Sequence, residues 1–210
     1  MTDARAAFHH GDLRAALIAS GLELSRTAGA EAIVLREATR RAGVTARAAY
    51  RHFADRDALV RAVAQAALAE MARTIERRQQ GATDPVAMLH ALGTGYIQFA
   101  LDEPGWFDVA FFAMADMLNT TAAESAGATG RSPYQQLEDA LAGLVRSGRL
   151  DPAQAPNAAL VCWSGVHGFA TLTSHGPLRD RPRDQVDQQA EYLVGYLVQS
   201  VVTIPPPPVA

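Results

Sequence analysis

The sequence of 210 residues contains one cysteine, no lysine and no long hydrophobic run. The lone Cys162 cannot form an internal disulfide and has no partner for a metal site, so we expect it to be a small buried hydrophobic residue. No apolar stretch reaches the roughly 18 residues that a membrane-spanning helix requires. The first residues lack the apolar segment of a secretory signal, and a cytoplasmic location is therefore expected.

The arginines are distributed unevenly along the chain. Residues 1–60 hold nine arginines and seven acidic residues, a net charge of +2, whereas residues 61–210 hold ten and fifteen, a net charge of −5. Within residues 35–53, five arginines stand against Glu37 alone, a net charge of +4. A short basic segment on an acidic chain favours contact with a polyanion, with an ordinary solvated helix face as the alternative.

Apolar residues recur at helical spacing almost throughout, without a long alternating strand pattern, which predicts an all-α fold of about nine helices. Asp12 is expected to begin the first helix and Gly29 to end it. Short helices are predicted over residues 35–42 and from 45 or 46 to 52. A long helix is predicted from a cap at Asp55 to about Gln80.

Prolines next to capping residues mark the later helices. Asp84-Pro85, Pro104, the capping-box run that starts at Ser132, and Asp151-Pro152 each predict a helix start. The helix that follows Asp151 has a possible interruption at Pro156, and the last helix is predicted over residues 184–203. Residues 119–131 are interpreted as a mobile loop, and residues 205–210 as a proline-rich disordered tail.

A helix-turn-helix is predicted between Leu35 and Phe53. Gly43 allows a backbone conformation that a side chain would obstruct, Val44 fills the corner between the two helices, and Thr45 caps the second helix. Helical spacing predicts that Ala46, Ala49 and Phe53 face the core. The outward residues are then Arg47, Ala48, Tyr50 and Arg51.

Several runs resemble the DNA-binding domain of the tetracycline-repressor (TetR) family. They are residues 35–38 (Leu-Arg-Glu-Ala), 41–45 (Arg-Ala-Gly-Val-Thr) and 50–59 (Tyr-Arg-His-Phe-Ala-Asp-Arg-Asp-Ala-Leu). The resemblance spans residues 9–63. Residues 163–168 (Trp-Ser-Gly-Val-His-Gly) are also similar to a Trp…His-Gly signature of one C-terminal subclass of the family. Val34 departs from the family pattern, because a Ser or Thr cap usually stands there.

The resemblance implies which residues contact DNA. The positions that match family contacts are Arg36, Thr45, Ala46, Arg47, Ala48, Tyr50, Arg51, His52 and Arg56. Among these, Tyr50, His52 and Arg56 match phosphate contacts. The side-chain chemistry agrees, because arginine can bond bidentately to guanine, which favours Arg36 and Arg47 as base readers. Tyrosine hydroxyl and imidazole N–H groups suit phosphate.

An aromatic and methionine cluster is the candidate effector pocket. Its members are Phe99, Trp106, Phe107, Phe111, Met114, Met117, Trp163 and His167. Such residues are more often plain core, and a pocket among them would favour a mainly apolar ligand. His167 is either a satisfied buried histidine or the polar handle that orients the ligand.

The expected organisation is a DNA-binding domain over residues 1–56, a ligand-binding and dimerisation domain over 57–204, and the tail at 205–210. The resemblance implies a homodimer through the last two helices, with an intramolecular core as the alternative reading of their apolar faces. A two-fold dimer suits a palindromic operator in double-stranded DNA.

The sequence therefore predicts a transcription repressor released by a small effector. The alternative is a ligand-binding dimer or an activator on the same fold. The chain shows no phosphate loop, nucleophile elbow or metal-ligand spacing, so we expect no enzyme activity, no metal and no cofactor.

Overall fold

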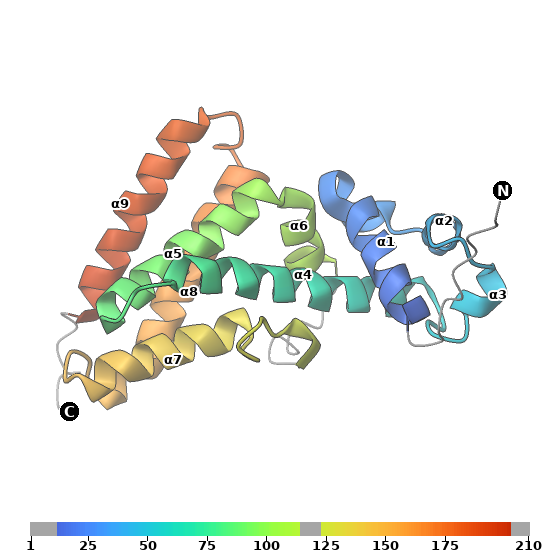
Figure 1. Cartoon of the computed structure of the whole chain (residues 1–210). Coiled ribbons are helices and arrows are strands. Elements are labelled where there is room, and N and C mark those ends of the chain that lie inside the picture. The colour runs from blue at the N-terminus through green and yellow to red at the C-terminus, as the bar shows by residue number, and fades with distance from the viewer. Residues whose placement is uncertain (1–11, 114–122, 203–210) are drawn as a thin grey trace, which may run out of the picture. The chain divides into compact units, whose positions relative to one another are not determined.

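The computed structural model describes residues 12–113 and 123–202, and this part of the chain is helical without strands (Figure 1). The all-α prediction is therefore confirmed, with helices α1 to α9 in the described ranges. The chain forms two compact units. The first comprises Met1–Ala67 with Gly105–Met117, and the second comprises Leu68–Pro104 with Leu118–Ala210.

The first unit contains the N-terminal helices and α6. Its elements are α1 (Asp12–Ala28), the 3₁₀ turn η1 (Gly29–Ala32), α2 (Leu35–Arg41), α3 (Ala46–Ala49), the first half of α4 (Arg56–Gln79), and α6 (Pro104–Phe112). A single hydrophobic core joins them, with Leu17, Ile33, Leu59 and Val63 fully buried. Val109 of α6 belongs to the same core, so a segment distant in sequence completes this unit.

Helix α6 is fastened to the end of α1 by polar and close-packed contacts. The indole N–H of Trp106 donates to the Leu22 carbonyl at 2.8 Å. The Arg26 guanidinium lies 5.1 Å from the centre of the Trp106 indole. Gly105 has no Cβ, and a Cβ there would fall 2.0 Å from the Ser25 carbonyl oxygen. The glycine therefore allows α6 to approach the α1 backbone.

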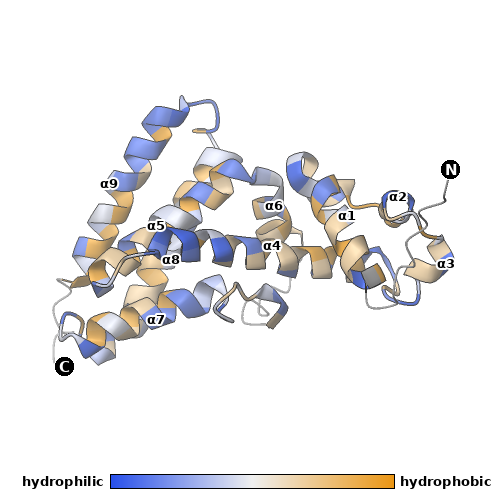
Figure 2. Cartoon of the chain, viewed as in Figure 1, coloured by the Kyte–Doolittle hydropathy of each residue, from blue (hydrophilic) through white to orange (hydrophobic). Residues whose placement is uncertain are grey.

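The second unit is built around α5. Its elements are the second half of α4, α5 (Pro85–Asp102), η3 (Ala123–Ser125), α7 (Pro133–Arg146), η4 (Pro152–Gln154), α8 (Ala155–Ser174) and α9 (Arg183–Val202). Gly93 lets α5 approach Val194 of α9, and Gly95 lets it approach the backbone of Ile75 in α4. Along α9, hydrophilic residues predominate in the N-terminal half and hydrophobic residues in the C-terminal half (Figure 2).

The predicted helix caps of this unit are confirmed. The Asp84 carboxylate accepts hydrogen bonds from the Val86 and Ala87 N–H groups, with Pro85 in the first turn of α5. Ser132 and Gln135 form the reciprocal capping box at the start of α7. Cys162 is buried as expected, and burial raises the pKa of its thiol to about 11.

Some predicted boundaries were wrong. The helix expected from 45 or 46 to 52 ends at Ala49, and residues 50–52 form a turn. Ala46 was expected in the core but is exposed, because it begins the short helix rather than lying along its inner face. Pro156 does not interrupt a helix; a 3₁₀ turn follows Asp151, and Pro156 lies in the first turn of α8.

Three sequence predictions fall outside the described residues: Met114, Met117 and the tail at 205–210. Within the two described ranges, no helix has the length and apolar character that a bilayer crossing requires.

Candidate functional sites

The helix-turn-helix has the local geometry that its sequence predicts. Gly43 has φ +67°, and a Cβ on it would meet no atom within 4 Å, so backbone conformation alone calls for glycine. The Thr45 hydroxyl accepts a hydrogen bond from the Ala48 N–H at 3.3 Å and caps α3. Ala49 and Phe53 are buried below it, and Val44 packs partly buried against the same core. The turn therefore presents the opposite side of α3 to solvent.

Three arginines are exposed on this surface and have no side-chain partner among the described residues. Arg36 begins α2, Arg47 lies in α3, and Arg51 follows α3. None of the three side chains makes a hydrogen bond or ion pair within the part of the chain that the structure describes. Tyr50 is 58% exposed between them. Unpaired guanidinium groups beside a phenol form a surface suited to base edges and phosphates.

The other predicted DNA-contact residues differ in exposure. Thr45, Ala46 and Arg56 are exposed, whereas Ala48 and His52 are half-buried.

Glu37 neutralises part of the basic segment. Its carboxylate accepts hydrogen bonds from Arg40 at 2.7 and 2.8 Å and from Arg41 at 3.2 Å. These arginine contacts lower the pKa of Glu37 to about 2, so the carboxylate stays charged. Val34, which precedes α2, provides no side-chain cap, as the departure from the family pattern predicted. The five arginines of this segment thus divide into a paired set and the unpaired Arg36, Arg47 and Arg51.

Arg56 differs from the other arginines because its side chain is directed to the backbone. Its Nε donates to the Ile33 carbonyl at 2.8 Å, and Nη2 donates to the Ala30 carbonyl at 2.6 Å. Nη1 lies 3.7 Å from a carboxylate oxygen of Asp57. Sequence patterns do not indicate these contacts, because they join residues more than 20 positions apart.

A polar-aromatic cluster joins α5, α7 and α8 in the second unit, with Tyr96 buried and Tyr134, Trp163 and His167 half-buried. Tyr96 Oη of α5 lies 2.9 Å from His167 Nδ1 of α8. Trp163 packs edge-on against His167 and against Tyr134 of α7, with ring centres 6.5 and 5.5 Å apart. Burial raises the pKa of Tyr96, although a hydrogen bond with Trp163 opposes this, and burial lowers the pKa of His167. Both groups are therefore neutral at pH 7.

The described members of the predicted effector cluster fall in both compact units. Phe99, Trp163 and His167 belong to the second unit, and Trp106, Phe107 and Phe111 belong to the first. Phe99 and Phe107 are almost completely buried, and the rings of Phe107 and Phe111 lie 4.9 Å apart.

Tyr96 and Tyr134 complete the polar-aromatic cluster but were missed by the sequence analysis. Tyr96 lies three residues before Phe99, so the helical spacing of aromatic residues was the available signal.

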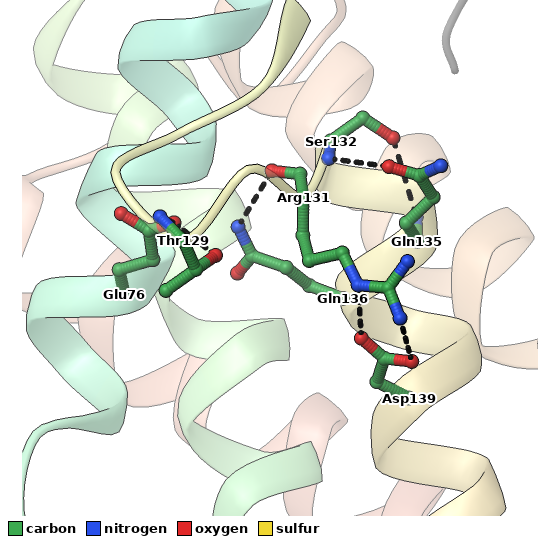
Figure 3. A network of polar contacts seen from close by, with 7 residues as sticks. All are labelled: Glu76, Thr129, Arg131, Ser132, Gln135, Gln136 and Asp139. Carbon is green, nitrogen blue, oxygen red and sulfur yellow. Dashed lines mark hydrogen bonds and ion pairs between the residues drawn. The ribbon is translucent and has the colours of Figure 1, made fainter. Parts of the chain in front are cut away.

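A cavity of about 370 Å³ lies between the end of α4, the start of α5 and α7. Pro85, Met88 and Ala140 are apolar residues that line the cavity. Charged residues also line it, namely Glu76, Arg131, Asp139 and Arg146. The Arg131 guanidinium pairs with Asp139 at 2.9 Å on one side (Figure 3). This cavity is separate from the residues that the sequence selected for ligand binding.

Glu76 of α4 holds the turn beside this cavity. Its carboxylate accepts hydrogen bonds from the Thr129 hydroxyl at 2.6 Å and from the Thr129 N–H at 3.0 Å (Figure 3). It also accepts one from the Ala128 N–H at 2.9 Å. Gln136 of α7 donates to the Ala72 and Arg131 carbonyls. The described part of the loop predicted over residues 119–131 is thus a hydrogen-bonded turn.

Helices α8 and α9 pack together and also expose large hydrophobic side chains. Gly165 lies close to Leu197, and Val186 and Val201 are buried within the unit, so part of the expected dimer face is intramolecular core. A second set of residues remains exposed: Leu160, Val161 and Leu172 on α8, and Tyr192 and Tyr196 on α9. Exposed apolar side chains grouped on two neighbouring helices are typical of a protein interface.

The sequence matches two family descriptions. Residues 17–63 match the bacterial regulatory proteins of the tetR family, and residues 89–197 match the tetracyclin repressor-like C-terminal domain. The first match contains the helix-turn-helix, and the second begins within α5 and ends within α9. None of the curated proteins matches this sequence significantly.

Solved structures share the fold over most of the chain. A protein of unknown function from Rhodococcus sp. RHA1 is 26% identical, with a TM-score of 0.71, over 94% of this chain and 100% of that chain. A TetR-family transcriptional regulator from Pectobacterium atrosepticum is 19% identical, with a TM-score of 0.70, over 96% and 100%. A TetR variant from Acinetobacter baumannii AYE in complex with minocycline is 21% identical, with a TM-score of 0.63, over 88% and 93%.

Proposed function

The chain belongs to the tetracycline-repressor (TetR) family of DNA-binding transcriptional regulators, and we propose that it is a cytoplasmic repressor that leaves its operator when a small effector binds. In this proposal a homodimer recognises a palindromic DNA site. The regulator performs no catalytic chemistry and requires no cofactor. The observation that carries the proposal is the helix-turn-helix surface on which Arg36, Arg47 and Arg51 are exposed, with no ion pair to any described residue.

Each exposed side chain of this surface has a proposed role on DNA. Arg36 and Arg47 read guanine edges in the major groove, because each can direct two parallel N–H donors to O6 and N7. Tyr50, Arg51 and His52 contact phosphates and fix the register of the helix. Thr45, Ala46 and Ala48 lie beside them and allow the short α3 to approach the bases closely.

We assign effector binding to the polar-aromatic cluster of the second unit. Trp163, Phe99 and the neighbouring aromatic rings would contact an apolar ligand body, and His167 would orient it. With the Tyr96 hydroxyl donating to Nδ1, a neutral His167 carries its proton on Nε2. The proposal assigns the run at residues 163–168 to the Trp…His-Gly subclass.

Dimerisation is assigned to the exposed hydrophobic side chains of α8 and α9. Leu160, Leu172, Tyr192 and Tyr196 would be covered by the same helices of a second subunit, as an isologous four-helix interface requires. A two-fold dimer presents two recognition helices to half-sites about one helical turn apart, roughly 34 Å along the DNA. That spacing is the quantity that an effector would change.

The proposed signal passes through α6 and α4. Helix α5 carries Tyr96 and Phe99 and ends at Asp102, so only Glu103 separates it from α6. Helix α6 in turn is fixed to α1 through Trp106 and Gly105. Helix α4 runs as one helix from the first unit into the second. A ligand that favours a different position of α5 would thereby lower DNA affinity by its differential affinity for the two states.

Fluorescence anisotropy in a salt series tests the proposal, with the promoter region beside the gene and with an unrelated duplex. We expect tight, salt-sensitive binding to the promoter, weakened about 10- to 100-fold by Arg47→Ala, as loss of a bidentate base contact implies. The matched control is Arg77→Ala, an exposed arginine on the part of α4 in the second unit. Weak binding that is equal on both duplexes, with no effect of Arg47→Ala, would overturn the repressor assignment for that DNA. Selection of a site from random duplexes would then decide whether the protein recognises any sequence.

A further inference from the structure

We propose that Arg56 is a positioning residue that holds η1 and the start of α2 in place for DNA recognition, rather than a phosphate ligand. This inference rests on the proposed DNA-binding function and reassigns a residue whose family position suggested a phosphate contact. The carrying observation is the pair of hydrogen bonds from one guanidinium to two backbone carbonyls.

The geometry uses the bidentate edge of the arginine. Nε and Nη2 lie on one edge of the guanidinium plane, and they reach Ile33 O at 2.8 Å and Ala30 O at 2.6 Å. Ala30 belongs to η1, and Ile33 is the C-cap of that turn. A charge-assisted pair of this kind fixes both distance and orientation, which a single donor cannot do. The first turn of α4 is thereby tied to the segment that leads into α2.

The remaining edge of Arg56 faces an unfavourable environment for phosphate. Nη1 lies 3.7 Å from the Asp57 carboxylate. Asp55 lies immediately before Arg56 and caps α4, accepting a hydrogen bond from the Ala58 N–H at 2.7 Å. The two acids and one arginine at this point give a local charge of −1. Arg36, Arg47 and Arg51 are also exposed, but unlike Arg56 they form no ion pair among the described residues.

The backbone segment that Arg56 binds is also held by a hydrogen bond to α6. Asp108 of α6 accepts a hydrogen bond from the Ala30 N–H at 3.4 Å. Gly29, with φ +64°, lies against the same carboxylate, and a Cβ there would fall 2.2 Å from Asp108 Oδ2. Ile33, next in the chain after η1, is completely buried. Residues of α4 and α6 therefore set the path of the chain just before Arg36.

The experiment compares Arg56→Lys and Arg56→Gln with the same two changes at Arg51, the matched exposed arginine. The probe is a duplex of roughly 30 base pairs selected from random DNA by the wild-type protein, long enough for two adjacent half-sites. Binding constants are measured across a salt series, and thermal unfolding is measured without DNA. Lysine retains the charge at position 56 but cannot span both carbonyls, so it separates the two roles.

We expect both Arg56 variants to bind about tenfold more weakly with an unchanged salt slope, and to unfold at a temperature a few degrees lower. We expect Arg51→Lys to resemble the wild type, and Arg51→Gln to reduce the salt slope by about one phosphate contact. The inference is overturned if Arg56→Lys binds DNA and unfolds like the wild type, and if Arg56→Gln reduces the salt slope of the binding constant by about one phosphate contact. If the wild type selects no DNA, the proposed function fails. The unfolding temperature of Arg56→Lys then decides by itself whether the hydrogen bonds from Arg56 to the Ala30 and Ile33 carbonyls stabilise the fold.

Discussion

The indole N–H of Trp106 donates a hydrogen bond of 2.8 Å to the backbone carbonyl of Leu22, 84 positions earlier in the chain. This contact fixes α6 to the C-terminal part of α1, within the unit that contains the helix-turn-helix. Helix α6 follows α5, the helix that carries Tyr96, after a single residue in the chain.

Replacement of Trp106 by phenylalanine should destabilise the first unit by about 1–2 kcal/mol. Phenylalanine keeps an aromatic ring but removes the indole N–H, so the half-buried Leu22 carbonyl keeps the Ser25 hydroxyl as a donor and loses that of Trp106. Denaturant unfolding followed by circular dichroism measures the loss. The comparison is Arg26→Gln, which removes the cation above the ring and should cost about 0.5–1 kcal/mol. Equal stability of Trp106→Phe and wild type would show that the hydrogen bond contributes nothing to the docking of α6.

His167 should make the stability of the second unit depend on pH. Burial lowers its pKa, so below the ordinary histidine value of about 6.5 the unfolded chain binds a proton that the folded chain does not. Stability from the neutral histidine is therefore present above that pH and is lost as the pH falls.

The variant His167→Gln isolates this effect. At pH 8 it should be less stable than the wild type by about 1 kcal/mol, because the hydrogen bond with Tyr96 is altered. The difference should narrow between pH 7 and pH 5 in chemical unfolding. A difference that stays constant or widens as the pH falls would contradict a neutral, desolvated His167.

Glu76 should stabilise the turn at residues 127–131 only while it is ionised. Burial raises the pKa of Glu76, but hydrogen bonds from Thr129 and Ala128 and the charge of Arg73 outweigh burial, so the net shift is downward. The stabilisation is complete above the ordinary carboxyl pKa and is lost as the pH falls through the lowered value of the folded protein.

We therefore expect Glu76→Gln to cost about 1 kcal/mol at pH 7 and progressively less as the pH falls below about 4.5. Glu70→Gln, on the same helix, removes an exposed pair with Arg73 and should cost less than about 0.5 kcal/mol. Thermal unfolding at several pH values measures both. Identical losses at the two positions would contradict a specific role of Glu76 in holding the turn.

The exposed hydrophobic residues of α8 and α9 should govern self-association. Leu160 is 62% exposed, and a charge there would be desolvated in a dimer interface. We expect sedimentation equilibrium to give a dimer for the wild type and a monomer at micromolar concentration for Leu160→Glu. Gln80→Glu adds the same charge at the end of α4 and should leave the dimer intact. A dimeric Leu160→Glu would place the interface elsewhere.

Local interactions made much of the architecture predictable from sequence. Helical periodicity, the caps at Asp84 and Ser132, and Gly43 with Thr45 depend on residues within about one helical turn, and the structure contains each of them. The exposed arginines of the helix-turn-helix could be predicted for the same reason. Ala46 was misplaced because a helix of four residues is barely longer than one turn, too short for periodicity to distinguish its faces.

Contacts between distant segments depended on tertiary packing. The sequence assigned Arg56 to phosphate, but folding brings the Ala30 and Ile33 carbonyls within reach of its guanidinium. It grouped Trp106, Phe107 and Phe111 with His167 by residue type, whereas packing places the first three in the unit of α1 and His167 beside Tyr96. The sequence alone determined the helices and their caps, because those interactions are local. Only the tertiary structure decided which polar groups form hydrogen bonds and ion pairs, because the partners of long side chains are the groups that folding brings close in space.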